Sequence, residues 1–465
     1  MTLIASISGI RGTIGGGQGE SLTPPDLVKY TAAFAFWLVK KYGFSDTAKS
    51  IVVGRDARLS GRMAEQIVCG TLRMAGFDVI RAGLATTPTV EMAVTYSGAS
   101  GGIIITASHN PREWNALKLL DRDGEFLTAA DGQSVLEIAD RNQIQFASVD
   151  ELGDQHDTDF LPYHIKEILN MKAVDAAAIR AAKLKVVLDP VHSVGAVAIP
   201  ELLKALGVQD IIMINGTADG RFSHLPEPLP ENLKDLSEMV VDHGADLGIA
   251  VDPDVDRLAL VNEDGSFFGE EFTLVAVADY MLSLHAGNTV SNLSSSRALK
   301  EITEKYGGTY FASAVGEVNV VDMMKKVDAV IGGEGNGGVI VPELHYGRDA
   351  LAGVALFLTH LVRSGQTMSE LRQRYPDLVI TKKKVSLPAE VNPDEILKQV
   401  AKKYQEFPLT LIDGVKVDFK QYWVHVRRSN TEPVIRVYAE ARDIRQANAA
   451  AGEFVNEILD IVKNC

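Results

Sequence analysis

A serine and a histidine stand side by side directly after a run of three isoleucines. They are Ser108 and His109, in the stretch Thr106-Ala107-Ser108-His109-Asn110-Pro111. The run 103–105 is typical of a buried strand, and Pro111 prevents the strand from pairing onward. A serine held at the end of a rigid strand can serve as a nucleophile. The alternative is a structural turn in which Ser108 and Asn110 bond their own backbone.

Three carboxylates follow a second apolar run. Asp252, Asp254 and Asp256 are spaced i, i+2, i+4 after Ile249-Ala250-Val251. Such groups repel one another unless a cation neutralises them, and hard oxygen ligands suit Mg²⁺ or Ca²⁺. An EF-hand is excluded because its sixth position requires glycine and here is Arg257. Three side chains leave room for an outside oxygen, which favours Mg²⁺ shared with a phosphate; the alternative is a solvated acidic turn.

A third polar stretch lies near the C-terminus, between two strand-like runs. Arginines, hydroxyls and an amide on one turn can cradle a phosphate. The candidates are Arg427, Ser429, Asn430, Thr431 and, just beyond them, Arg436. No GxxxxGK[ST] motif is present, so the pattern indicates a sugar phosphate rather than a nucleotide. The alternative is an ordinary hairpin loop.

The segment Gly332–Gly338 is rich in glycine but lacks the GxGxxG order of a dinucleotide site. Within it, Glu334 and Asn336 could bond sugar hydroxyls. Lys118, ten residues after Ser108, could support proton transfer or hold a phosphate, although a surface lysine is the alternative. Arg11 lies in a glycine-punctuated entry segment.

The elements that must position these residues repeat along the chain. A strand, a loop, a helix, a glycine and a second strand are predicted over 51–80, 185–214 and 289–311. These βαβ units predict three similar α/β domains, whose ligands bind at the carboxyl ends of strands. The last part reads as an α+β domain with antiparallel strands. We expect domains at 1–155, 156–257, 258–370 and 371–465.

Composition narrows the class of partner. The 465 residues carry a net charge of −15, which argues against nucleic acid or an anionic membrane surface as a partner. The two cysteines have no CxxC partner, so neither a zinc site nor a disulfide framework is indicated. The sequence shows no signal peptide and no apolar stretch of membrane-spanning length, and we expect a cytoplasmic protein.

With its four motifs in this order, the chain resembles the α-D-phosphohexomutase family over essentially its whole length. The family comprises phosphoglucomutases, phosphomannomutases and phosphoglucosamine mutases. The resemblance implies three similar α/β domains with mixed sheets and a C-terminal α+β domain around a central cleft. It also implies that Ser108 carries a phosphoryl group and binds Mg²⁺ with Asp252, Asp254 and Asp256. Four groups would line the transfer region: Arg11, His109, Lys118 and Arg257.

By the same resemblance, Glu334 and Asn336 contact the sugar, while Arg427, Ser429, Asn430 and Thr431 hold its phosphate. The implied reaction interconverts hexose 6-phosphate and hexose 1-phosphate through a hexose 1,6-bisphosphate, which also activates the enzyme. The implied protein is a monomer or homodimer whose partners are hexose phosphates. The sequence leaves the general acid and base unassigned.

One departure bears on the sugar. Many members have Ser where this chain has Asn336 and His where it has Gly338. The glycine-rich form is similar to that of archaeal-type phosphoglucosamine mutases, which favours glucosamine phosphate. The alternatives are a phosphomannomutase or phosphoglucomutase, a phosphatase that uses a phosphoserine, and a non-catalytic phosphosugar-binding protein.

Overall fold

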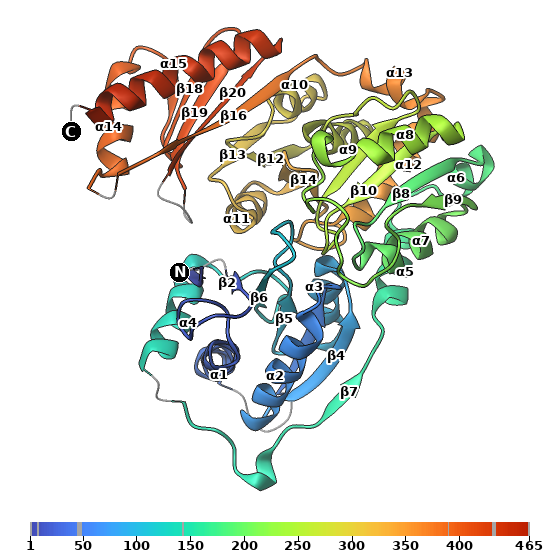
Figure 1. The fold of residues 1–465 in the computed structure, drawn as a ribbon. Helices are drawn as coiled ribbons and strands as arrows, with labels where there is room; N and C mark the ends of the chain where they lie inside the picture. Colours follow the sequence, from blue (N-terminus) through green and yellow to red (C-terminus); the bar gives the residue numbers. More distant parts are fainter. Residues whose placement is uncertain are drawn as a thin grey trace. The chain divides into compact units, whose positions relative to one another are not determined.

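The computed structural model describes residues 2–6, 9–43, 49–141, 144–388, 390–429 and 434–463. These residues form two compact units. The first comprises Met1–Tyr280 and Asn336–Ser369, and the second comprises Met281–Gly335 and Glu370–Cys465. Within the described ranges, no helix is both long enough and apolar enough to cross a membrane. Figure 1 labels most of the helices and strands named below.

The first sheet has seven strands in the order β1-β2-β6-β5-β3-β4-β7. It is mixed, because β3 runs parallel to β4 and β5 while β6 runs antiparallel to β2 and β5. The strands are β1 (Ile4–Ser6), β2 (Gly9–Thr13), β3 (Ser50–Arg55), β4 (Asp78–Leu84), β5 (Gly101–Ile105), β6 (Trp114–Leu120) and β7 (Gln155–Asp157).

Helices cover both faces of this sheet, which explains the run of isoleucines in β5. Ile103 and Ile105 pack on one face against α1 (Pro24–Tyr42), α2 (Gly61–Met74) and α4 (Ala129–Arg141). Ile104 packs on the other face against α3 (Thr87–Ser97). A strand buried on both faces needs apolar residues at every position rather than at alternate ones. The short helix η1 (Val149–Glu151) precedes β7.

The second sheet has the order β11-β10-β8-β9, with β11 antiparallel and the others parallel. Its strands are β8 (Lys185–Asp189), β9 (Asp210–Met213), β10 (Leu247–Val251) and β11 (Leu258–Asn262). The helices in this part of the chain are α5 (Leu161–Asn170), α6 (Ala176–Ala182), α7 (Gly195–Leu206), η2 (Pro230–Asn232) and α8 (Lys234–His243). The domain boundary expected near residue 257 falls inside this sheet, because β10 and β11 pair across it.

Two later helices belong wholly or mainly to the first unit. Helix α9 (Glu270–Leu284) follows β11, and α12 (Ala350–Ser364) packs against α5, α6 and α7. Asp349 caps α12, because its Oδ1 accepts hydrogen bonds from the amides of Leu351 and Ala352. Every residue of α12 from Ala350 to Leu361 is buried. A buried helix with a fixed first turn is a rigid support for the residues just before it.

The third sheet has the order β13-β12-β14-β15. Its elements are β12 (Asn288–Asn292), α10 (Ala298–Lys305), β13 (Tyr310–Ser313), α11 (Glu317–Val327), β14 (Ala329–Glu334) and β15 (Gly338–Ile340). Strand β12 runs parallel to β13 and β14. The glycine-rich segment of the sequence is therefore the end of β14 and the turn that leads to β15.

The C-terminal sheet is antiparallel, with the order β16-β20-β19-β18-β17. Its elements, preceded by α13 (Met368–Arg372), are β16 (Val379–Ser386), α14 (Pro393–Lys403), β17 (Leu409–Thr410), β18 (Val415–Asp418), β19 (Trp423–Arg428), β20 (Val434–Ala441) and α15 (Ile444–Lys463). Three α/β sheets followed by an antiparallel α+β sheet are the fold class that the sequence predicts.

Candidate active site

Ser108 lies just beyond the carboxyl end of β5, where it is 7% exposed. Its backbone is in the left-handed region with φ of 47°. Few residues other than glycine adopt this conformation, so the surrounding contacts must hold it in place. The Ser108 hydroxyl donates to Asp252 Oδ2 at 2.7 Å, and its Oγ lies 3.3 Å from His109 Nδ1. The serine oxygen therefore lies between a carboxylate and an imidazole.

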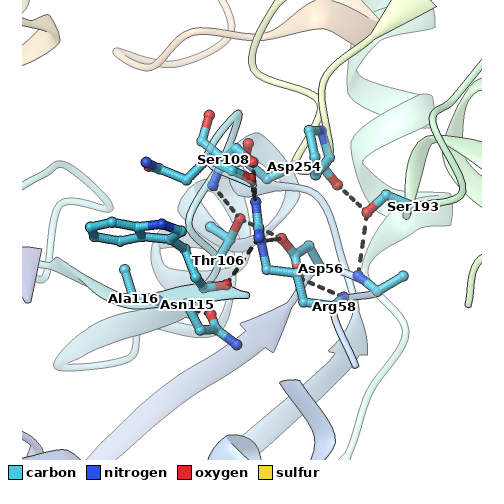
Figure 2. A network of polar contacts seen from close by, with 12 residues as sticks. Asp56, Arg58, Thr106, Ser108, Asn115, Ala116, Ser193 and Asp254 are labelled. Atoms are coloured by element: carbon cyan, nitrogen blue, oxygen red, sulfur yellow. Dashed lines mark hydrogen bonds and ion pairs between the residues drawn. The ribbon is translucent and has the colours of Figure 1, made fainter. Parts of the chain in front are cut away.

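The loop that bears Ser108 is held from below by one buried arginine. The Arg58 guanidinium donates to the carbonyl oxygens of four loop residues: Ser108, Asn110, Pro111 and Trp114. Its Nε donates to Asp56 Oδ2 at 3.0 Å, and the Thr106 hydroxyl donates to the same oxygen at 2.7 Å. Figure 2 shows Arg58 pointing into the loop beside Asp56 and Thr106. This network fixes where the serine oxygen points.

The three aspartates follow β10 and are fully buried. Asp252 Oδ1 accepts hydrogen bonds from the amides of Asp256 and Arg257, each at 3.1 Å, so the turn closes on its own first carboxylate. Val255, inside this turn, has φ of 62°, a strained value for a β-branched residue. One oxygen from each aspartate lies within 4.8 Å of the other two, which is close enough to share a cation.

Three cations surround these carboxylates. Lys118 Nζ lies 2.7 Å from Asp254 Oδ2 and 3.4 Å from Asp256 Oδ2. Arg348 Nη2 donates to Asp256 Oδ2 at 2.7 Å. Arg257 reaches Asp256 Oδ1 at 3.9 Å through Nε, while its Nη1 lies 3.1 Å from Glu227 Oε1. The positive groups offset the carboxylates of the turn whose first member, Asp252, accepts a hydrogen bond from the Ser108 hydroxyl.

The N-terminus of α3 supports the second carboxylate. The Thr87 hydroxyl donates to Asp254 Oδ2 at 2.6 Å, and the Thr87 amide donates to the Asp254 carbonyl at 2.9 Å. The helix therefore contributes both a side-chain donor and a free first-turn amide. Asp254 is thus fixed by an element that lies 167 residues earlier in the chain.

Burial and charge set the protonation of the site. Burial and the Asp256 and Asp254 carboxylates raise the pKa of Asp252 well above its usual value. Burial alone would lower the pKa of Lys118, but Asp254 and Asp256 outweigh it, so the net shift is upward and the ammonium stays charged. Burial, with Arg257 and Arg348, lowers the pKa of His109 well below its usual value. His109 is therefore a neutral imidazole at pH 7, which can accept a proton.

The donor set also fits a hard divalent cation. Among the described residues, Asp254 Oδ1 and Asp256 Oδ1 are buried and accept no hydrogen bond. Leaving a buried carboxylate oxygen unsatisfied is costly, and a cation bound there would remove that cost. Oxygen-only ligands with few protein donors are typical of Mg²⁺, which keeps positions for water and phosphate.

The remaining predicted sugar and transfer residues lie as follows. Arg11 is in β2, opposite Ala116 of the strand that bears Lys118. Glu334 ends β14, where it is buried and its Oε1 accepts hydrogen bonds from Asn292 Nδ2 at 2.8 Å and the Gly316 amide at 3.3 Å. Asn336 lies in the following turn, with its Oδ1 accepting from the Gly338 amide at 3.2 Å.

The predicted phosphate-binding residues flank one hairpin of the C-terminal sheet. Arg427 of β19 pairs with Arg436 of β20, which places two guanidinium groups on adjacent strands. Arg427 Nη1 lies 3.9 Å from Asp413 Oδ2, and its buried Nε donates no hydrogen bond to any residue that the structure describes. The Ser429 amide donates to the Val434 carbonyl at 2.9 Å. The predicted residues Asn430 and Thr431 lie outside the described residues.

Sequence reasoning grouped Ser108, His109, Lys118, Arg257 and the three aspartates, and the structure brings these residues together. Arg58 and Arg348 were not predicted from the sequence. A Cβ added at Gly338 would lie 2.4 Å from Arg348 Cδ, so the glycine leaves room for the arginine. The glycine at position 338 was the one sequence feature that could have pointed to Arg348. The sequence showed it only as the absence of a histidine, and nothing linked it to the arginine.

The chain matches four consecutive family models. They are described as Phosphoglucomutase/phosphomannomutase alpha/beta/alpha domain I over residues 4–145, domain II over 162–265, domain III over 270–378 and the C-terminal domain over 382–457. The second match extends through β11, in agreement with the second sheet.

Individual proteins similar to this chain carry names from the same family as these models. A phosphoglucomutase/phosphomannomutase of Thermococcus kodakarensis is 35% identical, with 94% of each chain covered. A phosphoglucosamine/phosphogalactosamine mutase of Sulfurisphaera tokodaii is 33% identical, with 98% of each chain covered. Among solved structures, a phosphoglucomutase/phosphomannomutase family protein from Burkholderia thailandensis aligns with a TM-score of 0.84 at 25% identity, covering 100% of this chain and 98% of that one.

Proposed function

Because this chain belongs to the phosphoglucomutase/phosphomannomutase family of phosphohexomutases, we propose that it interconverts glucosamine 6-phosphate and glucosamine 1-phosphate. The observation that carries the chemistry is the Ser108 hydroxyl, 2.7 Å from Asp252 within a buried carboxylate triad. A non-catalytic sugar-binding protein would have no need for a strained serine supported on such a triad.

Ser108 Oγ carries the phosphoryl group in this proposal. The bond from phosphorus to Ser108 Oγ breaks as a bond forms to the free hydroxyl oxygen of the hexose phosphate, giving a hexose 1,6-bisphosphate. The hexose hydroxyl gives up its proton, and the released Ser108 Oγ takes one up. The bisphosphate then returns its other phosphoryl group to Ser108. His109 is neutral and 3.3 Å from Ser108 Oγ, so it is our candidate for proton exchange at that oxygen.

Charge stabilisation is the main requirement of phosphoryl transfer. Lys118, Arg257 and Arg348 supply fixed positive charge around the transferring group. Asp252, Asp254 and Asp256 would hold Mg²⁺, which, when bound, neutralises phosphoryl oxygens as a Lewis acid. The contacts that hold Ser108 and Val255 in their strained backbone conformations keep both loops in the shape that this chemistry needs.

The second unit supplies most of the substrate contacts in this proposal, and Asn336 of the first unit adds one. Glu334 and, from the neighbouring turn, Asn336 bond the sugar, and the hairpin with Arg427, Ser429 and Arg436 grips the phosphate that is not transferred. Within the described part of the chain, the buried Nε of Arg427 donates no hydrogen bond, and a bound anion would accept one from it.

Two observations support the amino sugar. Glu334 is a buried acceptor that favours the glucosamine ammonium group, and a similar chain is named a phosphoglucosamine/phosphogalactosamine mutase. The second candidate is a phosphoglucomutase or phosphomannomutase, which the name of the Thermococcus kodakarensis relative favours.

The test is kcat/KM for glucosamine, galactosamine, glucose and mannose 6-phosphates on one preparation, with the matching 1,6-bisphosphate added. We expect glucosamine phosphate to give the highest value. If glucose or mannose phosphate wins by more than about tenfold, or roughly 1.4 kcal/mol of transition-state discrimination, the second candidate replaces the first. Inorganic phosphate released as fast as the substrate isomerises would instead indicate a phosphatase.

A further inference from the structure

A second buried cluster of ionisable side chains lies in the first unit, and phosphoryl transfer makes no direct use of it. Its members are Glu91 of α3, His164 of α5, His345 of the loop before α12, and Asp349, the residue that caps α12. Glu91, His164 and Asp349 are each at most 2% exposed. Burying this many polar groups is costly unless they interact with one another.

Asp349 is the centre of the cluster. Its Oδ2 accepts from His164 Nε2 at 2.8 Å and from His345 Nε2 at 3.2 Å. Its Oδ1 is already used as the cap of α12. His164 Nδ1 then accepts from the Thr89 hydroxyl at 2.9 Å. One carboxylate therefore joins α12 to α3 and α5.

His345 lies between two carboxylates. Its Nδ1 is 3.3 Å from Glu91 Oε2, while its Nε2 reaches Asp349. Burial alone would lower the pKa of His345, but hydrogen bonds to Asp349 and Glu91 raise it to about 10. The imidazolium form has two N–H donors, so it can bond both carboxylates at once.

The cluster encloses the backbone that carries Arg348. Arg348 follows Gly347 and precedes Asp349, and a Cβ at Gly347 would lie 1.9 Å from Glu91 Oε2. On the other side, the Ala350 amide donates to the Val255 carbonyl at 3.2 Å, which joins α12 to the strained aspartate turn. The Arg348 side chain then spans the remaining gap to Asp256.

We propose that Glu91, His164, His345 and Asp349 are positioning residues that hold Arg348 on Asp256. Through Arg348 they set the charge that a divalent cation and a phosphoryl group meet at the aspartate triad. The inference rests on the proposed function in one respect, that the triad binds Mg²⁺. In the unphosphorylated protein Arg348 repels the metal, whereas during transfer it stabilises the phosphoryl group.

The experiment is a double-mutant cycle with His345→Gln, Arg348→Ala and the double variant. His360→Gln is the matched control, because His360 is a buried residue of the same α12 and lies 3.7 Å from a carboxylate, Asp279 Oδ2. Two quantities are measured for each folded variant. One is the Mg²⁺ affinity of the unphosphorylated protein by calorimetry, and the other is kcat and KM with the best hexose phosphate.

We expect Arg348→Ala to bind Mg²⁺ at least about threefold more tightly, because a neighbouring cation is lost, and to lower kcat about tenfold or more. His345→Gln should shift both quantities in the same direction. In the Arg348→Ala background it should change neither by more than about twofold, since its effect passes through the arginine. His360→Gln should lower the melting temperature without changing either quantity.

Equal effects of His345→Gln with and without Arg348 would overturn the proposal, as would a folded His345→Gln protein with wild-type values. If that variant does not fold, Glu91→Gln replaces it, because it keeps the side-chain shape and removes the negative charge that faces His345 Nδ1. A stoichiometric metal ion in the wild type that His345→Gln loses would also overturn it, since the cluster would then be a metal site. Wild-type protein without mutase activity would instead refute the proposed function, while the calorimetric cycle would still test the positioning role.

Discussion

At the scale of single residues, Ser108 combines three features that rarely meet by chance. Its backbone is left-handed, its hydroxyl bonds a carboxylate, and its neighbour His109 is kept neutral by burial and two arginines. A structural turn would need none of these. The contacts from residues 252–257 therefore favour a nucleophilic Ser108 over a serine that only stabilises a turn.

We expect Ser108→Ala to lower kcat at least ~10³-fold, the order expected when a nucleophile is removed. Intact-mass measurement should find one phosphate on the wild type and none on the variant. Ser134→Ala, an exposed serine on α4, is the control and should keep the phosphate. Turnover of the Ser108 variant near the wild-type rate would refute the phosphoryl-carrier role.

We expect Asp254→Asn to weaken activation by Mg²⁺ about tenfold or more, because one of three charged ligands becomes neutral. A titration of activity against Mg²⁺ measures the effect, and a thermal melt shows whether the variant is folded. The control Asp242→Asn removes an exposed carboxylate from α8 and should titrate as the wild type does. Activity that survives EDTA unchanged would rule out the metal assignment.

At the scale of elements, the loop after β5 depends on Arg58 more than on its own sequence. One guanidinium satisfies four carbonyl groups and balances the buried Asp56 carboxylate. The planar fork of arginine suits this task, and lysine offers no equivalent geometry. The conformation of the loop after β5 therefore depends on Arg58, which lies between β3 and α2. Arg58 thus belongs to a different βαβ unit from the loop.

We expect Arg58→Met to destabilise the protein by about 3–5 kcal/mol, the usual cost of leaving a buried charge unpaired. Turnover should fall as well, because the Ser108 loop loses its support. Arg62→Met, an exposed position on α2, is the control and should change stability by less than about 0.5 kcal/mol. Urea unfolding measures the loss of stability, and steady-state kinetics on the same samples measures the loss of turnover. Wild-type stability and turnover in Arg58→Lys would contradict the requirement for an arginine.

At the scale of the whole molecule, the proposed function assigns phosphoryl transfer to residues of one unit and most substrate contacts to residues of the other. The first unit holds the serine, the aspartates and their cations, while the second holds Glu334 and the arginine hairpin. In the proposed function, binding energy gained where the hairpin holds the non-reacting phosphate helps to orient the reacting group of the substrate. Loss of a phosphate contact is therefore expected to affect binding first and turnover second.

We expect Arg427→Ala to raise KM about tenfold or more, since a charged hydrogen bond to phosphate is lost, with a smaller fall in kcat. Its neighbour Arg428 provides the control, because it is exposed and pairs with Asp394 at 3.7 Å instead. Steady-state kinetics with 1- and 6-phosphates separates the two constants. If KM were the same in wild type and Arg427→Ala for every hexose phosphate, the hairpin would have another role.

The sequence by itself determined the features that depend on neighbours along the chain. Three isoleucines predict a strand buried on both faces, and three aspartates two apart predict a cation site on one turn. The fold class follows from such local patterns, and the order of the motifs gives the resemblance to the family. The grouping of Ser108 with the aspartates, 144 residues away, was implied by that resemblance and not by any local pattern. Local patterns are readable because strand pairing and turn geometry constrain residues that are close in sequence.

Only the tertiary structure identified Arg58 and Arg348 among 46 lysines and arginines. Arg58 acts on a carbonyl 50 residues away and Arg348 on a carboxylate 92 residues away, so no spacing reveals them. Arginine is common on surfaces, and its partners here are oxygens whose positions exist only after the loops have folded. For the same reason, the sequence showed Gly338 only as the absence of a histidine. In the folded chain, the missing Cβ of Gly338 leaves room for the Arg348 side chain.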